Sequence, residues 1–172
     1  MAKQQEQQAV VEQLGRTRFF EALTADDLAT LVGACDRKIL APREALWAVG
    51  SVGDEAYILL DGQVELTWRL PPDGHRVDQM GDPGQMLGLS FLVKPWKHES
   101  AAMAVRRTEV LVMTRSSFEQ LLEASEEAAY FLIDEIAEQL VAEMRDANRR
   151  LHEVFGNPAE TLRTLRRRVR AT

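Results

Sequence analysis

Cysteine and histidine are scarce in this sequence. Its 172 residues contain one cysteine, Cys35, and three histidines. A single cysteine excludes an intramolecular disulfide and a cysteine-rich metal site. The histidines show no metal-ligand spacing, and no Ser/His/Asp or Cys/His pattern occurs in a recognisable context. We therefore expect a protein that is not an enzyme and that holds no metal or other cofactor.

Long apolar runs are absent too. No stretch approaches the roughly 18 apolar residues that a membrane span requires. The N-terminal residues 1–8 (MAKQQEQQ) lack the apolar core of a signal peptide. A lone cysteine fits a reducing compartment. We therefore expect a cytoplasmic protein without a membrane span.

Positive charge is in deficit overall but concentrated at one end. The net charge is −6, which disfavours nucleic acid as a partner of the whole surface. Residues 155–172 nevertheless carry +4, so the remaining residues carry −10. This basic tail is either a solvated end or a contact for acidic protein, nucleic acid or anionic lipid. Its arginines are Arg163, Arg166, Arg167, Arg168 and Arg170.

The middle of the chain consists of short β-rich runs bounded by turn residues. Val, Ile, Leu, Trp and Tyr dominate these runs, and Asp61-Gly62 is a typical hairpin turn between two of them. Such spacing favours a mainly β fold with flanking helices, in the form of an eight-stranded antiparallel jelly roll. The strands are expected at 37–41, 45–49, 56–61, 63–70, 75–80, 85–88, 101–106 and 109–114.

Helices are expected on both sides of the strands. Thr24, with Asp27 three residues later, is a typical N-cap for a short helix that ends at Gly33. A helix over 117–123 leads into a long one over roughly 126–155. The segments are then an N-terminal helix or tail (1–18, frayed), the β-roll (19–124), the long coiled-coil-like helix (125–155) and a basic C-terminal helix or tail (156–172).

The long helix carries a heptad seam of apolar residues in steps of three and four. Four repeats exceed what one roll can cover, so we expect a homodimer; the alternative is that the seam only joins the chain's own core. The seam residues are Tyr130, Ile133, Ala137, Leu140, Met144, Ala147, Leu151 and Val154.

The order of helix, roll, glycine turn and long helix resembles the cyclic-nucleotide-binding domain family, including the sensory half of catabolite-activator-type regulators. The resemblance runs from about Phe20 to Arg150. Its motifs are the hairpin signature over 50–64 (GSVGDEAYILLDGQV) and the approach to the phosphate-binding cassette over 80–88 (MGDPGQMLG). Glu99-Ser100-Ala101 resembles the strand that closes the cassette. The resemblance implies a jelly roll, a non-catalytic signalling role and a long dimerisation helix.

Two positions of the cassette depart from the family pattern. Where the family has a glutamate that bonds the ribose, directly after Gly88, this chain has Leu89. Where it has an arginine for the cyclic phosphate, this chain has His98 or, on the favoured alignment, Glu99. A carboxylate about 4 Å from a phosphate is repelled by about 4 kcal/mol at an effective dielectric of about 20. We therefore expect a degenerate ligand pocket formed by Gly88, Leu89, Ser90, His98, Glu99, Ser100 and Ala101.

Several readings of this region stay open. The 88–93 turn is either an anion site at a helix start or only an inherited turn. Ser90 either offers its hydroxyl to an anion or caps the helix, and His98 is either a weak cation or an exposed loop histidine. The loop over 94–97, with two lysines and Trp96, is a ligand lid, a partner contact or a solvated loop.

These patterns predict a regulatory or adaptor protein that acts through homodimerisation and a protein partner. The family's helix-turn-helix is not expected, because only 17 residues follow Phe155. One alternative is a small-molecule sensor, for a cyclic nucleotide or another nucleotide, with an altered pocket. Another is nucleic-acid binding through the arginine-rich tail.

Overall fold

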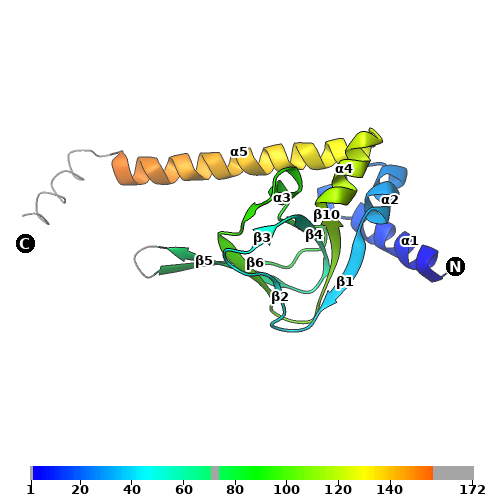
Figure 1. The fold of residues 1–172 in the computed structure, drawn as a ribbon, viewed down its shortest axis with the longest axis horizontal. Coiled ribbons are helices and arrows are strands. Elements are labelled where there is room, and N and C mark those ends of the chain that lie inside the picture. The colour runs from blue at the N-terminus through cyan, green and yellow to red at the C-terminus, as the bar shows by residue number, and fades with distance from the viewer. Residues whose placement is uncertain (1, 71–73, 157–172) are drawn as a thin grey trace, which may run out of the picture. The chain divides into compact units, whose positions relative to one another are not determined.

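The structure is a computed structural model that describes residues 2–70 and 74–156. Two compact units can be distinguished: residues 1–133, which contain the β-roll, and residues 134–172, which contain most of the long helix. Figure 1 shows the roll, with its strands drawn as arrows. No helix in the described ranges is long and apolar enough to cross a membrane.

Two antiparallel four-stranded sheets form the roll. In the first, the order is β1 (Asp36–Leu40), β10 (Thr108–Thr114), β4 (Glu55–Asp61) and β7 (Met86–Leu87). In the second, it is β2 (Ala45–Trp47), β9 (Ser100–Ala104), β5 (Val64–Leu70) and β6 (Gly74–Met80). Each of the eight expected strands is present within a few residues of its predicted bounds.

A third, two-stranded sheet was not predicted. Strands β3 (Val52–Gly53) and β8 (Trp96–Lys97) pair antiparallel, with Val52 opposite Lys97 and Gly53 opposite Trp96. The jelly roll expected from eight strands therefore has ten in the described residues. Strands of two residues show no alternation in sequence, so periodicity does not reveal them.

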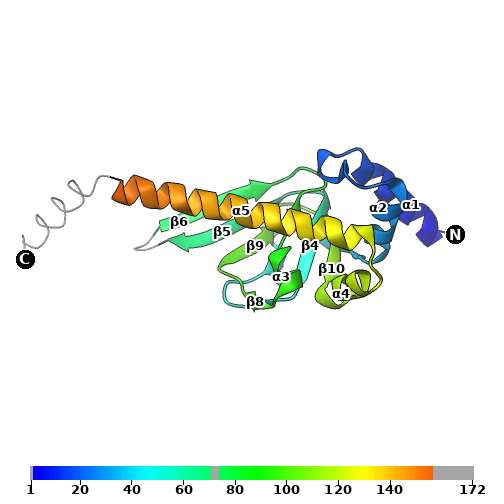
Figure 2. The same ribbon diagram turned by 90° about the horizontal axis from the view of Figure 1, so that it is seen from above.

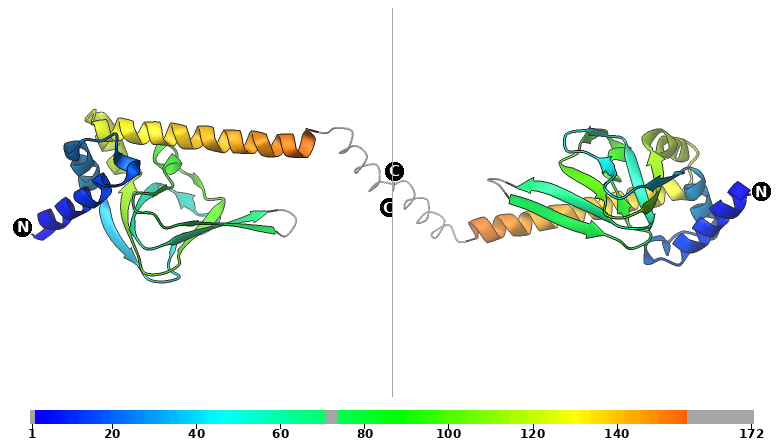
Figure 3. Two further views of the ribbon diagram at one scale, coloured as in Figure 1. Left: turned by 180° about the vertical axis from the view of Figure 1, so that it is seen from behind. Right: turned by 90° about the horizontal axis from the view of Figure 1, so that it is seen from below.

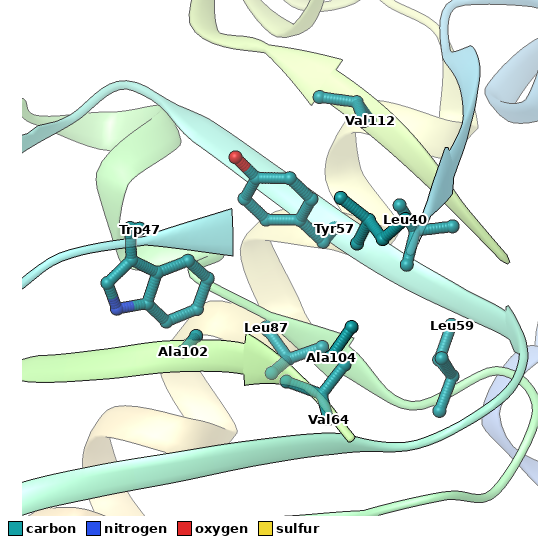
Figure 4. Packing of buried hydrophobic residues seen from close by; sticks show 10 residues of the cluster. Leu40, Trp47, Tyr57, Leu59, Val64, Leu87, Ala102, Ala104 and Val112 are labelled. Carbon is teal, nitrogen blue, oxygen red and sulfur yellow. The ribbon is translucent and has the colours of Figure 1, made fainter. Parts of the chain in front are cut away.

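The core lies between the two four-stranded sheets, because both contribute side chains to it (Figure 4). Alternate residues of a strand point to opposite faces, which places one apolar set of each strand inside. The first sheet provides Leu40, Tyr57, Leu59, Leu87, Val110 and Val112, and the second provides Trp47, Val64, Ala102 and Ala104.

The hairpin of β4 and β5 turns at Gly62, as expected, with φ of +107°. The next hairpin, β5–β6, pairs Val64 with Met80 and Trp68 with Arg76. It extends beyond the other strands of the roll in both views of Figure 3. The Arg76 guanidinium lies 5.1 Å from the Trp68 ring centroid, which is within cation–π range.

Helices α1 (Ala2–Gly15) and α2 (Ala25–Gly33) lie side by side (Figure 2). The short 3-10 helix η1 (Arg18–Phe20) lies between them in the chain. The expected Thr24 N-cap is present: its Oγ1 accepts a hydrogen bond from the Asp27 amide at 3.2 Å. The first helix is not the frayed segment we expected. Val10, Val11 and Leu14 are buried, and the Gln13 side-chain amide donates to the Leu60 carbonyl at 2.7 Å.

The chain leaves β10 through α4 (Arg115–Glu123) and continues into α5 (Glu127–Phe155), close to the predicted helices. The first turns of α5 belong to the roll unit, where Phe131 packs on Phe20 with ring centroids 5.6 Å apart. The remainder of α5 belongs to the second unit.

Candidate functional site

The glycine turn of the cassette has the backbone shape that the sequence predicts. Gly88 follows β7 with φ of +74°, a left-handed conformation that favours glycine. A Cβ atom at Gly88 would lie 3.0 Å from the Glu55 carbonyl oxygen, so the turn also passes close to β4. The single helical turn α3 (Ser90–Val93) then begins, as expected.

The two side chains that follow Gly88 differ in polarity and in burial. Leu89, at the position of the family's ribose-binding glutamate, is 3% exposed and therefore part of the apolar interior. Ser90 is exposed, and no side-chain cap is recorded at the start of α3. The Leu89 side chain itself has no polar group that could bind a sugar hydroxyl.

A hollow of about 250 Å³ lies beside His98. It is built by the end of β2, the 48–53 segment, the start of β4 and His98. Of the seven residues predicted to form the ligand pocket, only His98 lines it. The lining residues are Leu46, Trp47, Ala48, Ser51, Val52, Gly53, Asp54, Glu55, Tyr57 and His98.

His98 is buried, which contradicts its interpretation as an exposed loop histidine. Its side chain is 6% exposed, and its ring stacks on Trp47 with centroids 4.6 Å apart and planes 12° apart. The Phe91 ring also packs on the imidazole, with ring centroids 4.2 Å apart. Its backbone is fixed as well, because its amide donates to Ser51 and its carbonyl accepts from Gly50.

Gly53 makes this packing possible. A Cβ atom there would lie 2.5 Å from His98 Nε2 and 2.8 Å from Phe91 Cδ1, distances that no side chain tolerates without displacing its neighbours. A glycine is required at this position for the close approach of two rings, and its φ is not the reason.

Burial lowers the pKa of His98 below its usual value of 6.5. The folded state therefore prefers the neutral imidazole, and the unfolded state binds more protons between the two pKa values. We expect the stability of the protein to fall as the pH drops below about 6.5. The urea midpoint of unfolding should change less between about pH 8 and about pH 5 in His98→Gln than it does in the parent protein. His75→Gln, at an exposed position on β6, serves as the control and should behave like the parent; an unchanged pH dependence in His98→Gln would contradict the assignment.

The Trp47 side chain is 9% exposed, and its Nε1–H is buried without a hydrogen-bond partner in the described part of the chain. A buried donor without an acceptor costs about 1–3 kcal/mol. Figure 4 shows this indole among the core residues, next to Ala102. The ring also packs on Tyr57 at 5.6 Å, so its burial places an unmet polar group at the boundary between core and hollow.

The other predicted pocket residues lie on β9 or just before it. Glu99 is exposed, whereas Ser100 is buried and Ala101 is half-buried. Every second residue along β9 and the segment just before it is buried, namely 98, 100, 102 and 104. Because neighbouring residues of a strand point to opposite faces, Glu99 points away from the interior. The carboxylate therefore does not line the hollow. Arg106 does not reach the cassette, because its Nη2 donates to the Gly62 carbonyl at the hairpin.

The basic aromatic loop forms part of the outer surface. Trp96 on β8 is 60% exposed, and the Lys94 ammonium lies 5.6 Å from its ring centroid. This is a surface cation–π contact. The arginines predicted to form the basic tail, 163–170, lie outside the described residues.

The predicted seam of α5 presents its apolar side chains to solvent. Tyr130, Ile133, Leu140, Met144 and Leu151 are exposed, with Met144 at 65%. Ala137 and Ala147 are exposed as well, and Val154 falls in the last turn of the helix. An apolar stripe of this length on one helix is unusual for a free surface.

Cys35 is the single cysteine of the sequence. Burial raises the pKa of the Cys35 thiol to about 12, which leaves it a poor nucleophile. Among the described residues, no group of three or more His, Cys, Asp or Glu side chains is placed to hold a metal ion.

The sequence pattern of the cyclic nucleotide-binding domain family matches residues 37–125, just over half of the chain. The chain therefore belongs to this family, whose members are typically non-catalytic regulatory modules. The identification made from the glycine turn and the hairpin signature is confirmed.

Solved structures share the fold. The catabolite activator protein of Thermus thermophilus is 20% identical with a TM-score of 0.70; the match covers 80% of this chain and 63% of that protein. The N-terminal domain of a transcriptional regulator from Streptomyces coelicolor is 24% identical with a TM-score of 0.65, covering 78% and 93%. A cyclic nucleotide-binding-like protein from Brucella abortus is 29% identical with a TM-score of 0.55, covering 67% and 98%. No curated protein matches the sequence.

Proposed function

We propose that this chain is a regulatory or adaptor domain whose pocket no longer makes the ribose and phosphate contacts of its family. It acts through homodimerisation and protein partners. The observation that carries the proposal is the burial of Leu89, at 3% exposed, where the resemblance implies a glutamate that bonds the ribose. An apolar side chain turned into the core cannot accept a hydrogen bond from a sugar.

The electrostatics of the hollow support the same conclusion. Its lining holds two carboxylates, Asp54 and Glu55, and no lysine or arginine. An anionic guest would therefore meet negative charge without a compensating cation. The hollow of about 250 Å³ is also smaller than the roughly 300–1,000 Å³ of ordinary small-molecule pockets.

The apolar stripe of α5 supports homodimerisation. The sensory domains that the chain resembles carry a dimerisation helix at this place, and the stripe here has heptad spacing. Burial of Leu140 and Met144 against a second copy would remove two large exposed side chains from water. The dimer then presents two copies of the roll surface to a partner.

Calorimetric titration with cyclic AMP and cyclic GMP tests the proposed loss of nucleotide binding. We expect no saturable heat at nucleotide concentrations up to about 1 mM. Leu89 offers no hydrogen bond to the ribose, and the acidic lining offers no cation to the phosphate. Micromolar binding of either nucleotide by the parent protein would overturn the proposal.

A gain-of-function variant gives the positive arm of this experiment. Leu89→Glu with His98→Arg introduces the glutamate and the arginine that the resemblance implies, since His98 is the alternative position for the arginine and, unlike Glu99, lines the hollow. We expect binding to appear or improve about tenfold or more in the double variant, because the arginine supplies the cation that the lining lacks. Leu89→Glu alone is the matched control and should remain without measurable affinity.

A further inference from the structure

We propose that the hollow beside His98 binds a small organic cation, an amine or a guanidinium compound. This inference goes beyond the proposed function, which requires no ligand at all. It rests on the negative charge of the lining, on the aromatic rings around the hollow, and on two polar groups: the Glu55 carboxylate and the Trp47 Nε1–H.

The charge of the hollow is negative and uncompensated. Asp54 and Glu55 are its only ionised side chains when His98 is neutral, and neither forms an ion pair with another described residue. The Tyr57 hydroxyl donates to Glu55 Oε2 at 2.6 Å, which fixes this carboxylate at the wall of the hollow. Glu55 Oε1 keeps its capacity to accept a hydrogen bond from a guest.

Three aromatic rings meet at the same place. Trp47, Tyr57 and His98 all line the hollow, and the Trp47 ring packs on each of the other two. Aromatic rings attract cations through their quadrupole, most strongly in tryptophan and when water is excluded. The burial that keeps His98 neutral also keeps it from repelling a positive guest. Rings combined with carboxylates therefore favour an organic cation over an anion.

An independent observation also points to a guest. Trp47 is nine-tenths buried, and its Nε1–H lacks an acceptor among the described residues. Because this nitrogen has almost no accessible surface, a hydroxyl or carbonyl of a guest reaches it only if the indole turns toward the hollow. The volume of about 250 Å³ limits the guest to a small compound.

Titration calorimetry and thermal unfolding with putrescine, agmatine and choline test the inference on the full chain. We expect saturable binding of at least one of these cations, together with a rise in the unfolding temperature. The neutral diol with the carbon chain of putrescine has the same length and no charge, and it should not bind. Raising the salt concentration should weaken the binding.

Two variants connect this binding to the hollow. Glu55→Gln and Asp54→Asn should each lower the affinity about tenfold or more, because each removes a charge-assisted contact. Glutamine retains a side-chain oxygen for the Tyr57 hydroxyl, and Asp54 is exposed, so at least one of the two should fold. Glu99→Gln is the matched control, since Glu99 is exposed and outside the lining; it should bind like the parent.

The inference is overturned if none of the three cations binds saturably, or if both variants bind as the parent does. Either outcome leaves the loss of nucleotide binding intact, because that proposal is tested by the cyclic nucleotides. Conversely, micromolar cyclic AMP binding would overturn the proposed function whatever the cations do.

Discussion

Replacement of Trp47 by alanine should lower the free energy of unfolding by about 3–5 kcal/mol. The indole is 9% exposed and joins three parts of the molecule: the core between the sheets, Tyr57 and the ring of His98. Its removal leaves a cavity, because the closely packed strands around the indole cannot move inward to fill the space. Urea unfolding followed by circular dichroism measures the loss, and a fall in unfolding temperature of about 2–4 °C per kcal/mol accompanies it.

Trp47→Phe separates packing from polarity. Phenylalanine keeps an aromatic ring in the core and removes the buried Nε1–H that has no acceptor in the described residues. Because that donor costs about 1–3 kcal/mol, its removal offsets part of the lost volume. We expect the phenylalanine variant to lose less than half as much stability as the alanine variant. A loss below about 1 kcal/mol in Trp47→Ala would contradict the placement of this ring in the core.

Replacement of Met144 by lysine, alone or with Leu140→Lys, should convert the proposed dimer to a monomer. Both side chains belong to the exposed seam of α5, at 65% and 45% exposed. In a symmetric dimer each substitution appears twice, so the ammonium groups would be buried and would repel each other. Light scattering after size-exclusion chromatography, at micromolar protein, measures the mass of the particle.

Ala142→Lys provides the matched control for the seam. Ala142 is exposed on the same helix but on the face opposite to the seam, since α-helical residues repeat every 3.6 positions. This variant should remain a dimer. If the parent protein is itself a monomer at these concentrations, or if Ala142→Lys dissociates as readily as Met144→Lys, the seam is not the interface.

The strands of the roll were predictable because two signals agreed. Short runs rich in Val, Ile, Leu, Trp and Tyr marked β4, β5 and β10, and turn residues such as Asp61-Gly62 marked where they end. Strands β3 and β8 escaped detection because each has only two residues, too few for any period. Their pairing depends on a tertiary contact that local sequence does not encode.

The geometry of the site was predicted only in part. The backbone shape at Gly88 followed from its glycine turn, and the apolar nature of Leu89 is evident from the sequence. The burial of His98 was missed because it stands between Lys97 and Glu99, both charged. Inward alternation through residues 100, 102 and 104 extends back to this histidine, and that pattern was the available signal.

Trp47, Tyr57 and the two acidic residues of the hollow were not predicted as site residues. Asp54, Glu55 and Tyr57 entered only as part of the hairpin signature, and the fold brings Trp47, at the end of β2, and His98, before β9, to the same hollow. The N-terminal helix was underestimated for a related reason. Its many glutamines concealed the apolar positions Val10, Val11 and Leu14, which are enough to attach it.

Because Gly53 and His98 are in close contact, substitutions at these two positions cannot accumulate independently during evolution. Any side chain at 53 collides with the imidazole, so a lineage that acquires one must first shrink residue 98. Once residue 98 has become small and the Phe91 ring, 2.8 Å from the same Cβ position, has also given way, position 53 is released from its restriction. Mutational histories of this domain should therefore pass through a small residue at 98 before they gain a side chain at 53.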